Sequence, residues 1–224
     1  MRRNVPPQLY FIVSAVFHYL GPALAVLLFT RIEPLGVAWL RIASAGLIFA
    51  AWRRPWRAWR ILDTRTRRLA VGWGAVLALI LAVAGVYLLT DIRLSHDWIG
   101  LLCTALNALL FAAYVVLGHR VSRAAGLRRI DGLALAMGTA TVLALPVGAW
   151  AAVPAFRDLG LLAAAVGVGV CSSVIPYVAD QLAMARLKRS TFALMLALLP
   201  ATATVIGAVV LRQIPQVAEL VAVA

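Results

Sequence analysis

Acidic residues and charged residues in general are scarce in this sequence. Only 8 of its 224 residues are Asp or Glu, and only 13% carry a charge of either sign. A water-soluble domain of this length covers its core with polar and charged side chains. With 64% hydrophobic residues and a mean hydropathy of +0.96, this chain has too few polar and charged side chains to cover a core in water. The composition therefore excludes an ordinary soluble domain and predicts a protein that folds in lipid.

Cysteines and catalytic motifs are also scarce or missing. Cys103 and Cys171 lie inside apolar runs and form no CxxC pair, so neither a disulfide framework nor a metal site is implied. The sequence has no HExxH, no GxSxG, no Gly-rich phosphate loop and no paired carboxylates within an apolar run. We therefore expect no enzyme activity, no bound metal and no cofactor.

The net charge of +13 raises the question of a nucleic-acid partner. Nucleic-acid binders place Lys and Arg along one face, often with aromatic residues for stacking. Here the arginines occur in bursts between long apolar runs. The segment Arg53–Arg68 reads RRPWRAWRILDTRTRR, with seven arginines and one acid. This distribution predicts a lipid bilayer as the partner, and no nucleic acid.

Seven apolar stretches are long enough to cross a hydrocarbon core, which takes about 20 helical residues. They lack the alternation of a strand, and a helix satisfies its own backbone hydrogen bonds in lipid. We therefore predict an all-α fold, a polytopic transmembrane bundle of seven full spans plus a partial eighth that begins at Gln216. The seven stretches are Gln8–Thr30, Leu35–Trp52, Leu69–Thr90, Trp98–Gly118, Gly132–Ala152, Gly160–Leu182 and Thr191–Leu211.

Basic residues between the stretches predict the orientation. If the N-terminus is cytoplasmic, the segments on that side hold sixteen Lys and Arg residues, and those on the other side hold four. Cytoplasmic loops carry the excess of basic residues in membrane proteins. Trp52, Trp56, Trp59, Trp98 and Trp150 lie near the ends of stretches, where indole rings favour the interface. We expect a multi-pass protein of the bacterial inner membrane with a cytoplasmic N-terminus.

Two of the stretches carry an isolated charged or titratable residue. Arg41 lies within the second, in WLRIASAG. It either snorkels and caps carbonyls within the bundle, or takes a substrate or gating role. His18 forms a polar face on the first stretch with Ser14, Gly21 and Pro22. A single histidine there is more often a hydrogen-bonded packing residue than a proton carrier.

The fourth and sixth stretches each have a polar face. On the fourth, Asn107 and Tyr114 share a face with small residues, which favours a water-filled cavity over a close helix contact. The sixth carries Pro176 and Asp180, together with Ser172 and Ser173. Pro176 frees backbone carbonyls, as in the interrupted helices of transporter binding sites. Asp180 could bind a proton or cation, but its place near the cytoplasmic end favours a solvated interfacial acid, paired with Arg186.

Three segments resemble the EamA-type permeases of the drug/metabolite transporter superfamily, and most closely their threonine/homoserine exporter branch. They are EPLGVAWLRIASAGLIFAAWRRPWR, GLLCTALNALLFAAYVVLGHRVS and SSVIPYVADQLAMARLKRSTFALMLALLPATATVIGAVVL. The resemblance implies two five-helix repeats of inverted topology that export amino acids or other small metabolites by alternating access. It also implies that Arg41, Tyr114, Ser173, Pro176 and Tyr177 border the substrate path.

The sequence departs from this family in the first repeat. The stretch Leu69–Thr90 starts like the third family helix and ends like the fifth, so about two helices are missing between Ala78 and Leu79. On this basis, residues 1–90 form a shortened first repeat and 91–224 a second repeat without most of its last helix. Leu199 and Arg212-Gln213 replace the usual Glu and Gly-Glu around the ninth helix.

The functional expectation is a shortened inner-membrane exporter of amino acids or small metabolites. A homodimer would restore the enclosure lost with the missing helices. The alternative is a remnant of such a permease that inserts into the membrane without transporting.

Overall fold

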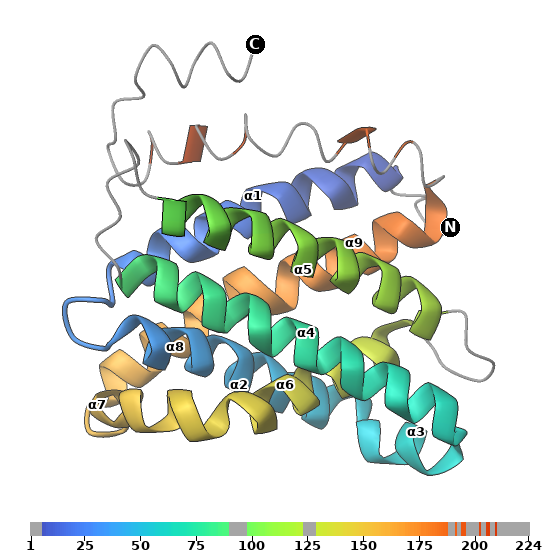
Figure 1. Ribbon diagram of the computed structural model, residues 1–224, viewed down its shortest axis with the longest axis horizontal. Helices are drawn as coiled ribbons and strands as arrows, with labels where there is room; N and C mark the ends of the chain where they lie inside the picture. Colours follow the sequence, from blue (N-terminus) through green and yellow to red (C-terminus); the bar gives the residue numbers. More distant parts are fainter. Residues whose placement is uncertain are drawn as a thin grey trace. The chain divides into compact units, whose positions relative to one another are not determined.

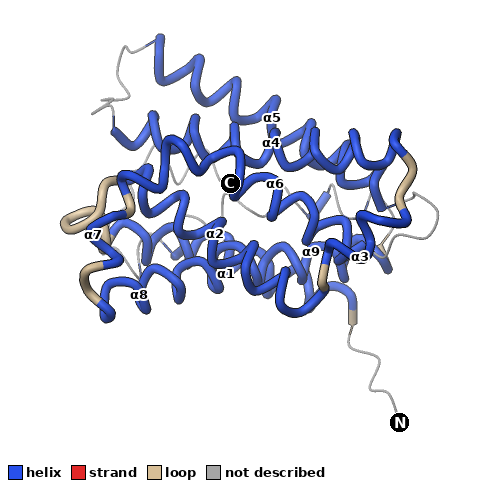
Figure 2. The backbone as a smooth tube through the Cα atoms, turned by 90° about the horizontal axis from the view of Figure 1, so that it is seen from below, coloured by secondary structure: helices blue, strands red, loops and turns tan. Residues whose placement is uncertain are grey.

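The computed structural model describes residues 6–89, 98–122 and 129–187, together with 191, 194–195, 202, 205–206 and 209. These residues form helices joined by turns, and no strand occurs among them (Figure 2). This confirms the all-α class for the described part. Four helical segments there are long and apolar enough to cross a membrane: Pro7–Val26, Pro34–Arg53, Ile130–Ala151 and Leu159–Arg186.

The chain divides into two compact units. The terminal unit contains Met1–Leu28 and Gly167–Ala224, and the central unit contains Phe29–Val166. These units reflect packing, whereas the expected repeats 1–90 and 91–224 reflect internal repetition. The repeat division therefore stays a prediction.

The helices of the central unit pack through α6. This helix contacts α2 and α4 along their lengths, and α4 also packs against α5 (Figure 1). Large buried side chains such as Phe49, Trp73, Leu133 and Met137 fill the space between them. The helices of this unit are α2 (Pro34–Arg53), α3 (Pro55–Ile61), α4 (Thr64–Leu89), α5 (Trp98–Ser122), α6 (Arg129–Ala151), α7 (Val153–Phe156) and most of α8 (Leu159–Gly169).

Small residues bring the central helices into close contact. A Cβ on Gly74 of α4 would lie 2.6 Å from the carbonyl oxygen of Ala136 on α6. Trp39 of α2 packs directly on Gly148 of α6, and its indole N–H donates to the Thr141 carbonyl at 3.2 Å. Apolar surfaces provide little driving force between helices in lipid, so close packing and interhelical hydrogen bonds of this kind hold them together.

The arginine-rich segment contains a helix that the sequence did not predict. Arg54 adopts a left-handed conformation (φ 50°) that ends α2, and Pro55 then starts α3. Helix α4 begins before its apolar stretch because Asp63 caps it. The Thr66 hydroxyl and nearby backbone N–H groups donate to the Asp63 carboxylate and hold its pKa below the ordinary value.

The terminal unit packs α1 (Pro7–Val26) against a second helical run. This run continues from α8 through a π-helical turn, η1 (Val170–Val174), into α9 (Ile175–Arg186). Pro176 has no N–H to bond to the Ser172 carbonyl four residues earlier, and just before it the Ile175 N–H bonds to the Val170 carbonyl five residues earlier. The predicted interruption at Pro176 is thus a widened turn within a continuous helical run.

Six helical segments coincide with predicted apolar stretches, with ends that differ by a few residues. They are α1, α2, α4, α5, α6 and the run from α8 to α9. The stretch Thr191–Leu211 lies largely outside the described residues, and the partial eighth span lies wholly outside them. The total of seven full spans and the inverted-repeat arrangement stay predictions.

Candidate functional site

The terminal unit holds a polar cluster in which α1 faces α9. On α1, Ser14 and His18 are one turn apart, so both point to the same side. The Ser14 hydroxyl lies 2.5 Å from Asp180 Oδ1 and 3.2 Å from the Pro176 carbonyl oxygen, both on α9. One serine therefore connects the two helices through two oxygen atoms of α9.

His18 completes this cluster. Its Nδ1 lies 3.2 Å from the Ser14 hydroxyl and 4.0 Å from Asp180 Oδ2. The imidazole also meets the Tyr177 ring edge-on, with 5.5 Å between the ring centres. These contacts confirm that His18 is hydrogen-bonded, and they bring four of the predicted site residues together: His18, Pro176, Tyr177 and Asp180.

Asp180 is enclosed by protein. Its side chain is 14% exposed, and that of His18 is 25% exposed. The guanidinium of Arg186 lies over the Tyr10 ring, 5.2 Å from its centre. The interpretation of Asp180 as a solvated interfacial acid was therefore wrong. Sequence position gave its depth along the helix, but which face of α9 meets α1 depends on packing.

Ser172 and Ser173 are buried on η1 beside the cluster. The Ser172 hydroxyl donates to the Val168 carbonyl at 2.6 Å, and its backbone packs directly on Gly21 of α1. Because a Cβ on Gly21 would be 2.5 Å from Ser172 Cα, only glycine allows this approach. In this structure Ser172 helps join α1 to η1, and a role for either serine in a substrate path stays a prediction.

The other predicted site residues belong to the central unit. Arg41 is half-buried on α2, where its carbonyl accepts a hydrogen bond from the Ser44 hydroxyl at 3.1 Å. Tyr114 on α5 is 4% exposed and packs against the Trp73 and Phe111 rings. Asn107 lies on α5, but its side chain falls outside the described part of the chain.

The polar face of α5 serves helix contact where it is described. A Cβ on Gly118 would lie 2.7 Å from the Trp73 ring, so the glycine lets this indole pack against α5. Tyr114, one turn earlier, packs on the same ring with 5.6 Å between ring centres. Of the two interpretations of this face, close helix contact fits these residues better than a water-filled cavity.

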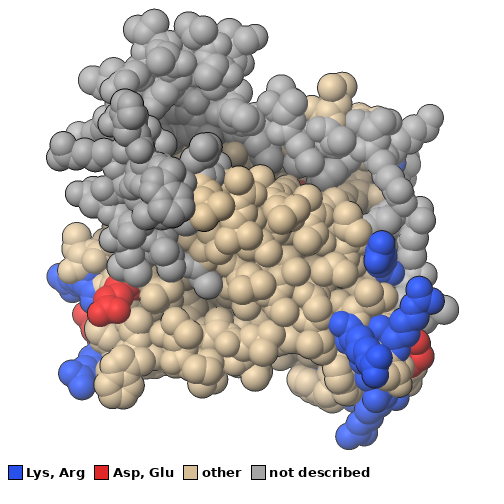
Figure 3. All heavy atoms as spheres, in the orientation of Figure 1, with Lys and Arg blue, Asp and Glu red and all other residues tan. Residues whose placement is uncertain are grey.

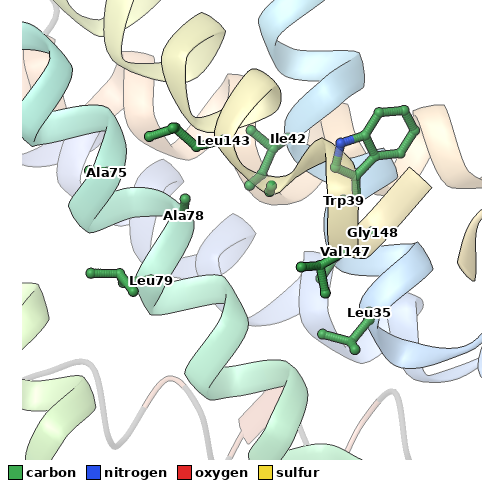
Figure 4. Close-up of a pocket in the computed structure, with 11 residues that line it drawn as sticks. Leu35, Trp39, Ile42, Ala75, Ala78, Leu79, Leu143, Val147 and Gly148 are labelled. Carbon is green, nitrogen blue, oxygen red and sulfur yellow. The ribbon is translucent and has the colours of Figure 1, made fainter. Parts of the chain in front are cut away.

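An apolar cavity of about 320 Å³ lies between α2, α4 and α6 (Figure 4). None of the predicted site residues lines it. The sequence did not point to this cavity, because the residue types of its wall are common in every span. It offers no charged or hydroxyl side chain to an amino acid. The lining residues are Leu35, Ala38, Trp39, Ile42, Ala75, Ala78, Leu79, Leu143, Ala144, Val147 and Gly148.

Ser14 is the residue that the predicted site omitted. It contacts His18, Asp180 and the Pro176 carbonyl, whereas the sequence marked it only as a neighbour of His18. The useful signal was its spacing of four residues from that histidine. Within the described ranges no three His, Cys, Asp or Glu side chains come together, so we assign no metal site.

Apolar helices of membrane-crossing length, with a polar cluster on two of them, define a multi-pass helical membrane protein. Among curated proteins, the chain is similar to the threonine/homoserine exporter RhtA from two strains of Salmonella typhimurium, SL1344 and LT2. Each is 25% identical over 250 aligned positions that cover 92% of this chain and 84% of the relative. No protein-family model matches the chain. No solved structure matches it significantly.

Proposed function

We propose that this chain is a secondary transporter of the bacterial inner membrane that exports amino acids or related small metabolites by alternating access. The observation that carries the proposal is its similarity to an amino-acid exporter over 92% of the chain. Threonine and homoserine, the substrates in the relative's name, define the proposed class of small zwitterions.

Arg41 is the residue we assign to the substrate carboxylate. It lies on α2, one of the helices long enough to cross the membrane, where charged side chains are rare and usually mark a substrate pathway. A guanidinium binds a carboxylate through two parallel hydrogen bonds, which gives both affinity and orientation. The proposed substrate path includes this arginine and eight further residues: His18, Asn107, Tyr114, Ser172, Ser173, Pro176, Tyr177 and Asp180.

Efflux by an Arg41→Ala variant tests this assignment. Threonine or homoserine uptake into inverted membrane vesicles should fall at least about tenfold, because the carboxylate loses its charged partner. Arg57→Ala is the matched control, since Arg57 is an exposed arginine on α3, and it should transport at the wild-type rate. Equal amounts of both variants in the membrane are required. Normal efflux by Arg41→Ala would remove this residue from the path.

The second candidate is a membrane remnant that does not transport. It is favoured by the aligned length of 250 positions, which exceeds the 224 residues of the chain, so part of RhtA faces gaps here. Helix α4 runs without interruption through Ala78 and Leu79, where the family resemblance locates the missing helices. Both residues also line the apolar cavity.

Purified protein in liposomes separates the two candidates. Saturable flux of an amino acid from a panel that includes threonine and homoserine would support the exporter. Absence of flux for every member of the panel, under an imposed pH gradient or membrane potential, would support the remnant.

A further inference from the structure

The surroundings of Asp180 determine whether its carboxyl group can be ionised. The side chain is mostly enclosed and lies in the helical segment Leu159–Arg186, which is long enough to cross a membrane. An ionised carboxylate there needs a cation or several hydrogen-bond donors, and without them it binds a proton instead. His18, with its Nδ1 4.0 Å from Asp180 Oδ2, is positioned to supply the cation.

The hydrogen bonds around Ser14 can satisfy Asp180 in both protonation states. When the carboxylate is ionised, the Ser14 hydroxyl donates to Oδ1 across 2.5 Å. When Oδ1 carries a proton, the carboxyl donates to Ser14, and the Ser14 hydrogen can turn to the Pro176 carbonyl at 3.2 Å. A single hydroxyl rotation thus serves both states while the heavy atoms stay in place.

His18 can adjust in the same way. Its Nδ1 lies 3.2 Å from the Ser14 hydroxyl and 3.3 Å from the Ser14 carbonyl oxygen. It donates through Nδ1 to either oxygen both as a protonated imidazolium and as the neutral ring that carries its hydrogen on Nδ1. Each member of the cluster therefore has a partner whether the pair holds one proton or none.

We propose that His18 and Asp180 together bind one exchangeable proton, and that this pair is the proton-coupling site of the exporter. The proton resides on the imidazole in an ion pair or on the carboxyl in a neutral pair, and both forms carry the same total charge. Release of that proton leaves a carboxylate and a neutral imidazole. The use of the proton in transport rests on the proposed function, whereas its binding does not.

The helices that carry the pair hold other titratable groups. Among the described residues of α1, η1 and α9, these groups are three tyrosines, one cysteine and one arginine. The arginine, Arg186, lies over the Tyr10 ring. Tyr177 faces the imidazole of His18 with its ring edge, which favours a specific ring orientation. The full set is Tyr10, Tyr19, Cys171, Tyr177 and Arg186.

Infrared difference spectroscopy of the purified full-length protein in detergent tests proton binding without any substrate. Between acidic and basic buffer, the wild-type protein should show a carboxyl C=O band that is absent from Asp180→Asn. Asp158→Asn is the matched control, because Asp158 is a half-exposed acid outside the cluster, and it should keep the band. The His18→Gln variant should change the midpoint of this band by at least about one pH unit, because the carboxyl then titrates without the base that shares its proton.

The outcomes distinguish failure of the proton site from failure of the transport function. A carboxyl band that persists in Asp180→Asn, or a midpoint unchanged in His18→Gln, would overturn the proton site even if the protein transports amino acids. If the band behaves as expected and the protein moves amino acids in liposomes, a pH gradient should accelerate flux by the wild type and have no effect on Asp180→Asn. Unchanged acceleration in that variant would overturn the coupling role alone. If the band behaves as expected but no substrate is transported, the proposed exporter function is contradicted and proton binding is established.

Discussion

At the scale of single residues, two ion pairs among the described residues of the central unit differ in their contact with solvent. Arg53, in the last turn of α2, donates through Nε to Asp131 Oδ1 at 2.7 Å, and the side chains are only 20% and 16% exposed. Arg31 and Asp158 are 3.8 Å apart, with side chains 70% and 50% exposed. Water screens the second pair far more than the first, so the two should contribute differently to stability.

Replacement of each acid by asparagine measures this difference. We expect Asp131→Asn to lower the free energy of unfolding by about 2 kcal/mol, because Arg53 loses a charged, partly buried hydrogen-bond partner. Asp158→Asn should cost less than about 0.5 kcal/mol. Its side chain also accepts from the backbone N–H groups of Gly160 and Leu161, and asparagine keeps this cap. Thermal unfolding in detergent is the measurement, and equal losses in the two variants would contradict it.

The polar cluster shows how far residue-level prediction could go. His18, Pro176, Tyr177 and Asp180 could be selected because polar residues and prolines are conspicuous inside apolar stretches. Their mutual contacts could not, because which face of α9 meets α1 is a property of packing. Ser14 was passed over for a related reason, since serine alone is a common small residue in membrane helices.

At the scale of helices, the contact of α1 with η1 depends on a glycine, which has no side chain. Gly21 lies directly against the backbone of Ser172, in the π-helical turn before Pro176. This turn sets the direction in which α9 leaves α8, and α9 carries Asp180. The packing at Gly21 therefore supports the geometry of the polar cluster.

A methyl group at Gly21 tests this contact. We expect Gly21→Ala to destabilise the protein by about 2 kcal/mol, because the added Cβ overlaps the Ser172 backbone, which cannot move aside as a flexible side chain would. Gly167→Ala, on α8 of the same unit, is the control, since its Cβ meets no described atom within 4 Å. It should be neutral or slightly stabilising in a helix. Similar unfolding temperatures for the two variants would argue against the close contact.

Long helices were the predictable part of the fold. Apolar stretches of about 20 residues identify them because lipid permits few other backbone structures. The short helix α3 was not predicted, since its arginines gave no apolar period, and it depends on the turn at Arg54 and on Pro55. The π-helical turn also escaped prediction, because Pro176 shows where a hydrogen bond is lost but not how the backbone compensates.

At the scale of the molecule, charge is distributed as expected for a membrane protein. In Figure 3, Lys and Arg side chains gather at the end of the central unit that holds α3, and the visible surface between α3 and α7 has no charged side chain. Large apolar side chains such as Val142 and Val147 on α6 and Leu47 on α2 are exposed, as lipid contact requires. The exposed arginines of the α3 end are Arg54, Arg57, Arg60, Arg65 and Arg68.

This distribution predicts which side of the membrane each end of α6 reaches. The N-terminal end, where Asp131 pairs with Arg53 at the end of α2 just before α3, should face the cytoplasm, and the α7 end should face outward. Export by the proposed mechanism requires a helical bundle that crosses the membrane, with one end at each membrane surface. The orientation of α3 relative to the bilayer is therefore the central claim.

Labelling of single cysteines with a membrane-impermeant maleimide tests this claim most directly. In a protein whose Cys103 and Cys171 are replaced by alanine, one variant carries Ile61→Cys on α3 and another carries Phe156→Cys on α7, both at exposed positions. In spheroplasts we predict that the cysteine at 156 is labelled at once, and that the cysteine at 61 is labelled only after the membrane is permeabilised. Labelling at 61 in sealed spheroplasts would contradict the cytoplasmic placement of the arginine-rich segment, and recovery of both variants as soluble protein without detergent would contradict the membrane fold itself.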